Sequence, residues 1–245
     1  MRVNGVRFSI ASHAAWAPGV NTTEAWKEWA QAPFPFAGGA DPLVTAMPAM
    51  LRRRAGFLGK MALEVAYQCL DGRTGVPTVF CSRHGEVARA VDLISELVEQ
   101  QSVSPTGFGL AVHNASAGLF SIARKDQANH IALAAGDGTI EHAVIEACGL
   151  LAEGEPMVLL VAYDNTLPDV FSQFKEGNEQ AYAWAWLMVP EQADVIELSC
   201  LSSDGVMQGN AAMAAGLEVL RFQLSGQTLL ERVAGQRCWR WSRHA

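Results

Sequence analysis

The stretch FGLAVHNASAGLFSIA, residues 108–123, predicts how the rest of the chain is organised. Its apolar beginning, 109–112, is typical of a buried strand, and the small residues at 113–118 indicate a sharp turn. Apolar residues then recur with helical spacing as far as Ala123. This pattern predicts a strand that turns into a helix and presents one side chain at the helix N-terminus, where unpaired N–H groups suit a nucleophile or a thioester carbonyl. A tight strand-to-helix turn without any chemistry, in any α/β domain, would give the same pattern.

Two neighbouring segments have the pattern of further buried strands. Residues 130–138, HIALAAGDG, are apolar and end in glycines, and residues 78–86, TVFCSRHGE, run from an apolar start into a polar turn. The remaining patterns predict strands at 3–12, 157–162, 181–189 and 195–201, and helices after the capping box 21–24 and at 51–70, 86–101, 139–152, 210–224 and 228–233.

The arrangement of these elements can be predicted further at two places. Strands 181–189 and 195–201 would form a hairpin, and the tail 238–245 would add an edge strand. Large aromatic rings bury much area per residue, so three tryptophans of the first thirty residues are expected in one core cluster. They are Trp16, Trp26 and Trp29.

The order of strand, long helix, strand, elbow, helix and strand resembles the amino-terminal half of a ketosynthase of the thiolase superfamily. MP at 47–48, with three arginines at 52–54 and a long helix after them, is similar to the family's early helix. VFCSRHGE, 79–86, resembles its second strand, and SVSPTGFGLAVHNASAG, 102–118, resembles the segment that enters its nucleophile elbow. The resemblance covers residues 1 to about 160.

This resemblance implies an α/β, thiolase-like fold with a mostly parallel mixed sheet and helices on both faces. The whole chain, 1–245, would form a single ketosynthase-like domain. Residues 1 to about 165 would make the thiolase-like core, and residues from about 166 to 245 a shortened C-terminal part.

The chemistry of the family requires residues that this chain lacks. A decarboxylating ketosynthase needs a cysteine at the elbow and two basic residues, usually histidines, to assist decarboxylation. The resemblance places the nucleophile position on Ser116, or one residue earlier on Ala115, and neither is cysteine. Past Gly154 the only histidine is His244, so the family's histidine motifs are missing. We therefore assign no catalytic residue and expect that the chain does not condense acyl groups by itself.

The sequence is compatible with two alternative functions. Ser116 could act as the nucleophile of an acyltransferase or hydrolase if a general base lay beside it. His113 lies three residues earlier, but the chain has no GxSxG motif. The chain could also be a homodimeric protein that binds an acyl group.

A partner is implied by the resemblance. Within the family, the strand before the elbow pairs with its counterpart across a two-fold axis, and an apolar edge strand at 108–113 would need such a partner. The chain resembles the chain-length-factor-like subunits of aryl polyene pathways. This implies a heterodimer or heterotetramer with a catalytic ketosynthase, whose acyl tunnel this subunit shapes, and only indirect contact with the acyl carrier protein. The residues expected at the tunnel and the dimer interface are Phe108, Leu110, Val112, His113, Asn114, Ala115, Ser116 and Phe120.

The composition excludes several classes of partner. Half of the 245 residues are hydrophobic, which supports a sizeable core, and the formal net charge of -7 argues against nucleic acid. Five scattered cysteines without a CxxC motif indicate a reducing cytoplasm and no disulfide framework. No metal site is expected because His and Cys do not cluster, and no cofactor is implied. The longest apolar run, 157–163, is far shorter than the ~20 residues of a membrane span.

Two polar features have more than one interpretation. The arginines at 52–54 crowd the start of the predicted helix 51–70, where cations are unfavourable, so an internal salt bridge or contact with a phosphate or carrier protein is expected. Asp164 follows a predicted buried strand, where it could contact a ligand or cap a turn.

Overall fold

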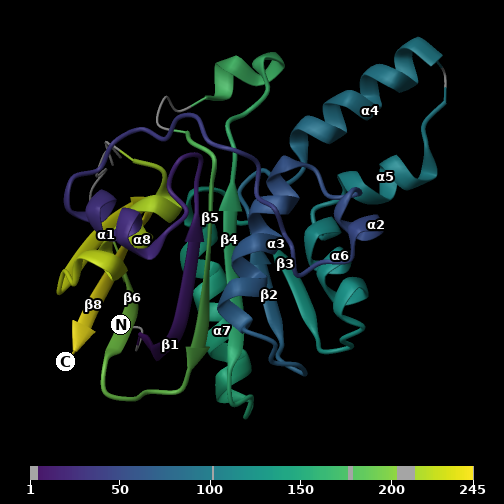
Figure 1. The fold of residues 1–245 in the computed structure, drawn as a ribbon. Helices are drawn as coiled ribbons and strands as arrows, with labels where there is room; N and C mark the ends of the chain where they lie inside the picture. Colours follow the sequence, from purple (N-terminus) through teal and green to yellow (C-terminus); the bar gives the residue numbers. More distant parts are fainter. Residues whose placement is uncertain (1–4, 101, 176–178, 203–212, 245) are drawn as a thin grey trace.

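The eight strands found in the described part of the chain belong to one sheet (Figure 1). The structure is a computed structural model that describes residues 5–100, 102–175, 179–202 and 213–244. The strand order is β3-β2-β4-β5-β1-β6-β8-β7. The strands are β1 (Val6–Trp16), β2 (Thr78–Cys81), β3 (His130–Leu133), β4 (Val158–Asp164), β5 (Tyr182–Val189), β6 (Val195–Ser202), β7 (Leu229–Ala234) and β8 (Arg237–His244).

Helices cover both faces of this sheet. The α-helices are α1 (Thr23–Gln31), α2 (Ala49–Arg52), α3 (Phe57–Leu70), α4 (Val87–Gln100), α5 (Pro105–Ala111), α6 (Ala115–Arg124), α7 (Thr139–Ala152) and α8 (Ala215–Ser225), with short 3-10 helices at Gly136–Gly138 and Asp169–Phe174. Helices α3 and α6 pack in one hydrophobic cluster, and α1, α7 and α8 pack in another. Strand β4 separates the two clusters, because Leu160 and Ala162 belong to one and Val161 and Tyr163 to the other.

The expected α/β fold with a mixed sheet is confirmed, but the sheet is not mostly parallel. Within the described residues, β2 runs parallel to β3 and to β4, and the other five neighbouring pairs are antiparallel. The mostly parallel sheet was implied by the resemblance, and the strand pairs beyond β4 do not follow it. Strand β5 shows that a continuous buried run need not be parallel, because all its residues are buried although both of its neighbours are antiparallel. Helices on both faces give such a strand the continuous apolar run that usually marks a parallel one.

The three tryptophans do not form one cluster. The rings of Trp26 and Trp29 on α1 pack edge to face, with 5.2 Å between their centroids. Trp16 packs against Phe57 on the opposite face of the sheet. The register of β1 shifts between Ile10 and Ser12, which marks a β-bulge. One extra residue reverses the alternation of side chains. The bulge therefore places Trp16 on the face opposite to that of the even-numbered residues before the bulge.

Several predicted boundaries and pairings were wrong for identifiable reasons. The segment 108–113 is not a strand, because Ser104 caps helix α5 by accepting from Gly107 N at 3.3 Å, and Pro105 is its first residue. The predicted helix 51–70 is divided, and α3 begins only after Gly56. Helix α1 begins after Thr22 and not after Asn21.

The C-terminal strands also pair differently from the prediction. Strands β5 and β6 are not a hairpin, because β1 lies between them in the sheet. Residues 228–233 are not a helix, since most of them form β7, and β7 makes β8 an inner strand. The first residues of the predicted segments 3–12 and 210–224, and the last residues of 86–101 and 238–245, lie outside the described residues.

Candidate functional site

The elbow lies where α6 begins. The predicted sharp turn into a helix is confirmed: Asn114 precedes the first helical residue, Ala115, and Ser116 is buried in the first turn, 1 % exposed. The chain arrives there from helix α5 through the extended residue Val112, and not from a strand. Ser116 therefore occupies a helix N-terminus, as expected for the nucleophile position of the family.

The hydroxyl of Ser116 is already engaged with buried neighbours. Ser116 hydrogen-bonds Tyr163 on β4; burial raises the pKa of Tyr163 and this hydrogen bond lowers it. On the other side, a methyl group added to Gly59 of α3 would lie 3.1 Å from Ser116 Oγ and 3.2 Å from Glu86 Oε1. The crevice among these residues is too narrow to admit a water molecule. A substrate carbonyl has no room to reach Ser116.

The histidine nearest in sequence is not positioned as a base for Ser116. His113 Nε2 lies 3.1 Å from the carbonyl oxygen of Leu133, at the end of β3. The ring lies directly against Gly85, whose positive φ of 58° and missing side chain leave space for it. His113 thus joins the elbow to the ends of β2 and β3, and among the described residues it makes no hydrogen bond to Ser116.

The residues described as lining the crevice beside Ser116 include no cysteine. Cys69, Cys81 and Cys148 are buried, and burial raises the pKa of Cys69 to about 11 and that of Cys148 to about 12. Such thiols are protonated near neutral pH and react poorly. Across the described residues, no three His, Cys, Asp or Glu side chains are placed to share a metal ion.

The remaining residues expected at a tunnel or interface divide into two groups. Phe108 is 63 % exposed on α5, and Val112 and Asn114 are exposed as well. Ala115 and Phe120 are buried, and Phe120 packs against Tyr67 at 5.0 Å; Leu110 is partly buried at the crevice beside Ser116. Only the first group is accessible to a partner.

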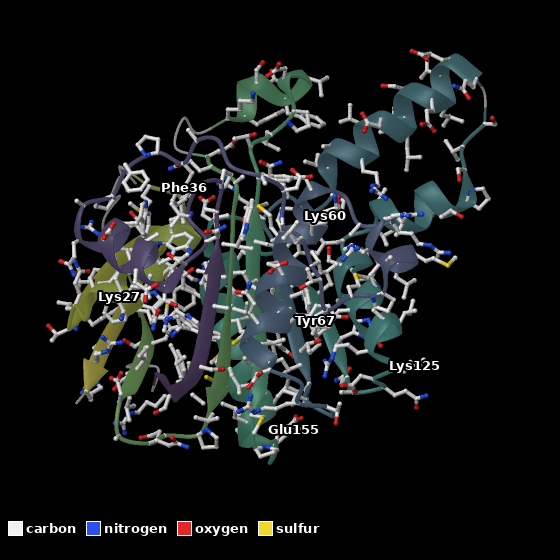
Figure 2. All side chains as sticks on the ribbon, viewed as in Figure 1. Lys27, Phe36, Lys60, Tyr67, Lys125 and Glu155 are labelled. Carbon is white, nitrogen blue, oxygen red and sulfur yellow. The ribbon has the colours of Figure 1, made fainter. Side chains whose placement is uncertain are left out.

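The largest feature that sequence reasoning missed is a helical arm formed by α4 and α5 with the described residues 102–104 before α5. Helix α4 has no buried residue. The helix extends away from the body of the molecule (Figure 1), and its side chains stand on all sides of it (Figure 2). The arm stands at the end of the sheet where β3 is the edge strand (Figure 1). Its exposed large apolar side chains are Ile94, Leu97, Val98, Val103 and Phe108. The sequence did show a helical periodicity here, but periodicity does not reveal whether the apolar face is covered.

The arginines at 52–54 do not make the expected internal salt bridge among the described ion pairs. Arg52 donates instead to the carbonyl oxygens of Leu43 and Val44, at 3.3 and 3.4 Å. Because α3 begins at Phe57, these arginines precede that helix, and the conflict with its dipole is smaller than expected.

A separate polar cavity of about 340 Å³ lies at the C-terminal ends of β2 and β4. Asp164 lines it and accepts hydrogen bonds from Ser82 Oγ at 2.8 Å and Arg83 N at 2.9 Å, which is the turn-capping role. Burial raises the pKa of Asp164 from 3.8 to about 6, although these hydrogen bonds oppose the shift.

The raised pKa of Asp164 predicts a pH dependence of stability. The folded chain binds this proton more tightly than the unfolded chain, so the protonated carboxyl contributes fully below about pH 4 and this contribution is lost as the pH rises through 6. We expect the free energy of unfolding of Asp164→Asn, measured by urea titration, to lack this decline between pH 4 and 6.5. Parallel curves for the wild type and the variant would contradict the assignment.

The close contact at Gly59 predicts a second stability effect. Gly59→Ala pushes a methyl group against Ser116 and Glu86, and we expect it to cost about 1–2 kcal/mol in urea unfolding. Gly118→Ala on α6 is the control, since its methyl group would meet nothing within 4 Å and alanine favours a helix by about 0.5–1 kcal/mol. Equal effects of the two variants would show that the crevice is not tightly packed.

Comparison with known proteins assigns the fold to a family. The family model described as "Beta-ketoacyl synthase, N-terminal domain" matches residues 26–242. A chain in the complex of the ketosynthase ApeO with its chain length factor ApeC from Xenorhabdus doucetiae is similar, with a TM-score of 0.86 and 26% identity over 97% of this chain and 100% of that chain. No curated protein matches.

Two more distant structures show a likeness of fold. A chain from the AntDE:AntF complex, a type II acyl carrier protein with its ketosynthase, gives a TM-score of 0.74 at 10% identity over 97% of this chain and 99% of that chain. The ishigamide ketosynthase/chain length factor gives 0.53 at 11% identity over 91% and 70%. With the family model matching most of its length, this chain belongs to the beta-ketoacyl synthase N-terminal domain family.

Proposed function

We propose that the chain is a non-catalytic chain-length factor that pairs with an active beta-ketoacyl synthase and forms part of the wall of its acyl tunnel. The observation that carries this proposal is the state of the elbow. The nucleophile position is a serine whose hydroxyl hydrogen-bonds Tyr163, in a crevice that admits no water. A chain that keeps the ketosynthase fold without its reactive centre is best suited to act through a partner.

The exposed surface of the arm supports a protein partner. Ile94 and Val98 are 62 % and 76 % exposed, and Phe108 on the neighbouring helix is 63 % exposed. Soluble monomers rarely leave neighbouring large apolar side chains in water, and such groups usually mark an interaction site. Acidic residues on α4, such as Glu96 and Glu99, favour a partner surface that combines apolar and basic side chains.

The edge of the sheet beside the arm would contribute to the same interface. Among the described strands, β3 pairs only with β2, and its residues are half-buried. Its free edge has unpaired backbone groups that a partner strand could complete. This edge takes the place of the strand expected at 108–113, and Phe108 and Val112 remain the candidates for the tunnel wall.

The finer assignment concerns the pathway and the carrier protein. The complex of the ketosynthase ApeO with its chain length factor ApeC supports a ketosynthase as the partner. Biosynthesis of the polyene or fatty-acid type, and specifically an aryl polyene pathway, is our own proposal. The net charge of -7 disfavours direct docking of an acidic acyl carrier protein, which would then contact this subunit only through the ketosynthase.

Co-expression tests this function. The chain should co-elute in size exclusion with a ketosynthase co-expressed from a neighbouring gene, and omission of the chain should change the length of the acyl product. A serine enzyme would instead be labelled by a fluorophosphonate at Ser116, and a homodimeric acyl-binding protein would show twice the chain mass in native mass spectrometry without the ketosynthase. Separate elution with unchanged products would end the proposal.

No helix among the described residues combines the length and apolar character needed to cross a membrane.

A further inference from the structure

Both ends of the arm return to the elbow. Helix α4 begins at Val87, directly after Glu86, and α5 ends at Ala111, two residues before His113. His113 lies against Gly85, so the two ends of the arm touch each other at the base. Whatever fixes these ends also fixes the direction of the arm.

The carboxyl group of Glu86 occupies the crevice beside Ser116. The position of a methyl group on Gly59 lies 3.2 Å from Glu86 Oε1 and 3.1 Å from Ser116 Oγ, which places both oxygens against α3. Burial raises the pKa of Glu86, and nearby Arg89 lowers it. Glu86 therefore ends the β2 loop inside the body of the molecule, although the helix that follows it is exposed.

Arg89 makes a second attachment one helical turn further along. Its Nη2 atom donates to the carbonyl oxygen of Arg54 at 3.3 Å. A methyl group on Gly56, at the start of α3, would lie 3.2 Å from Arg89 Nη2 and 3.6 Å from Glu86 Oε2. Gly56, directly before α3, and Gly59 within α3 thus leave the space in which both side chains lie, and larger residues would displace the arm.

Beyond these attachments the arm is supported only weakly. Helix α4 has no buried residue. It packs on α5, where Leu93 approaches Gly107 so closely that a methyl group there would lie 3.1 Å from Leu93 Cδ2. The two helices therefore support each other, and the contacts at the base determine how they are held relative to the sheet.

We propose that Glu86, Arg89 and Ser116, fitted against Gly56 and Gly59, form a socket that positions the arm for binding the partner. In this chain the elbow does not hold an acyl group; it anchors the interface. Glu86 is a positioning residue that acts through α4. This inference rests on the proposed function, because it assumes that the arm contacts the ketosynthase.

The test compares Glu86→Ala with Glu64→Ala in the complex with the ketosynthase. Glu64, also a carboxylate, accepts from Val44 N at 2.5 Å and from Gln68 Nε2 at 2.7 Å, and neither of these partners belongs to the arm. We expect Glu86→Ala to weaken binding about tenfold in titration calorimetry, a change of about 1.4 kcal/mol, and Glu64→Ala to leave the affinity unchanged. Glu86→Gln, which keeps the shape and an oxygen acceptor, should restore most of the affinity.

Hydrogen exchange of the uncomplexed chain distinguishes a positioning role of Glu86 in the arm from a general contribution to stability. In Glu86→Ala the amides of α4 and α5 should exchange about tenfold faster, while those of α3 and β4 keep their wild-type rates. Wild-type affinity with unchanged exchange in the arm would overturn the socket. If charged substitutions at Ile94 and Val98 also left binding intact, the proposed interface itself would fail, so the two ideas can fail separately.

Discussion

The double variant Ile94→Glu/Val98→Glu will bind the partner ketosynthase at least about a hundredfold more weakly and will fold as the wild type does. Both side chains lie one helical turn apart on α4, and both are largely exposed in the uncomplexed chain. Because α4 has no buried residue, and glutamate favours a helix, the substitutions remove nothing that the fold needs. In a complex, each carboxylate would lose its hydration against an apolar partner surface.

The measurement is a titration of the purified chain into the ketosynthase, together with thermal unfolding of the chain alone. A matched control is Val170→Glu/Leu229→Glu, which places two charges on exposed apolar positions of the 3-10 helix after β4 and of β7. This control should bind like the wild type, because neither position belongs to the arm. Equal loss in both double variants would show that surface charge, and not the arm, determines binding.

Elements with strong periodicity and clear ends could be predicted from the sequence. Helix α7 was predicted with the bounds that it has, Thr139–Ala152, because Gly154 and the apolar spacing mark it on both sides. Strands β2 and β4 were recognised from apolar runs that end in polar turns. These signals are local, so they can be recognised without knowledge of the tertiary contacts.

The errors arise where a distant contact decides the outcome. Nothing near Trp16 shows that a bulge after Ile10 reverses the faces of β1. Nothing near Val195 shows that β1 separates β5 from β6. The segment before the elbow is a different case, because the Ser104-Pro105 pair is a local signal for a helix start that the apolar run concealed.

The candidate site was predicted only in part for the same reason. The spacing predicted a turn at 113–118 that leads into a helix, and the resemblance placed the nucleophile position on Ser116, which lies in the first turn of α6. The role of Glu86 could not be predicted, because its carboxyl comes to lie beside Gly59, at the crevice that Ser116 also lines, only after β2, α3 and α6 have packed. A glycine inside a helix, such as Gly59, was the available signal, since it often marks a close approach of another element.

Arg232→Met is expected to have the largest effect on stability, about 3–5 kcal/mol. Arg232 on β7 is 6 % exposed and pairs with Glu141 on α7 and, at 2.7 Å, with Glu218 on α8. Glu141 is fully buried, and Trp241 Nε1 donates to it at 3.4 Å. Removing the guanidinium leaves that carboxylate buried without its cation, and desolvation then acts against the folded state.

The control is Arg240→Met on the adjacent strand β8. Arg240 pairs with Glu231, but both side chains are close to half exposed, and surface ion pairs contribute about 0–1 kcal/mol. Urea unfolding of the two variants should therefore differ by at least about 2 kcal/mol. A small effect of Arg232→Met would show that water reaches Glu141.

The same ion pairs join the two parts of the chain that the sequence suggested. Glu141 belongs to the part before residue 165, whereas Arg232 and Glu218 follow it. Strands β5 to β8 also come from the later part and continue the same sheet. We therefore expect one cooperative transition in the wild type, detected alike by tryptophan fluorescence and circular dichroism. In Arg232→Met, α7 and α8 lose the ion pairs that connect them through β7. If the C-terminal strands then loosen first, the unfolding transitions detected by fluorescence and by circular dichroism should no longer coincide.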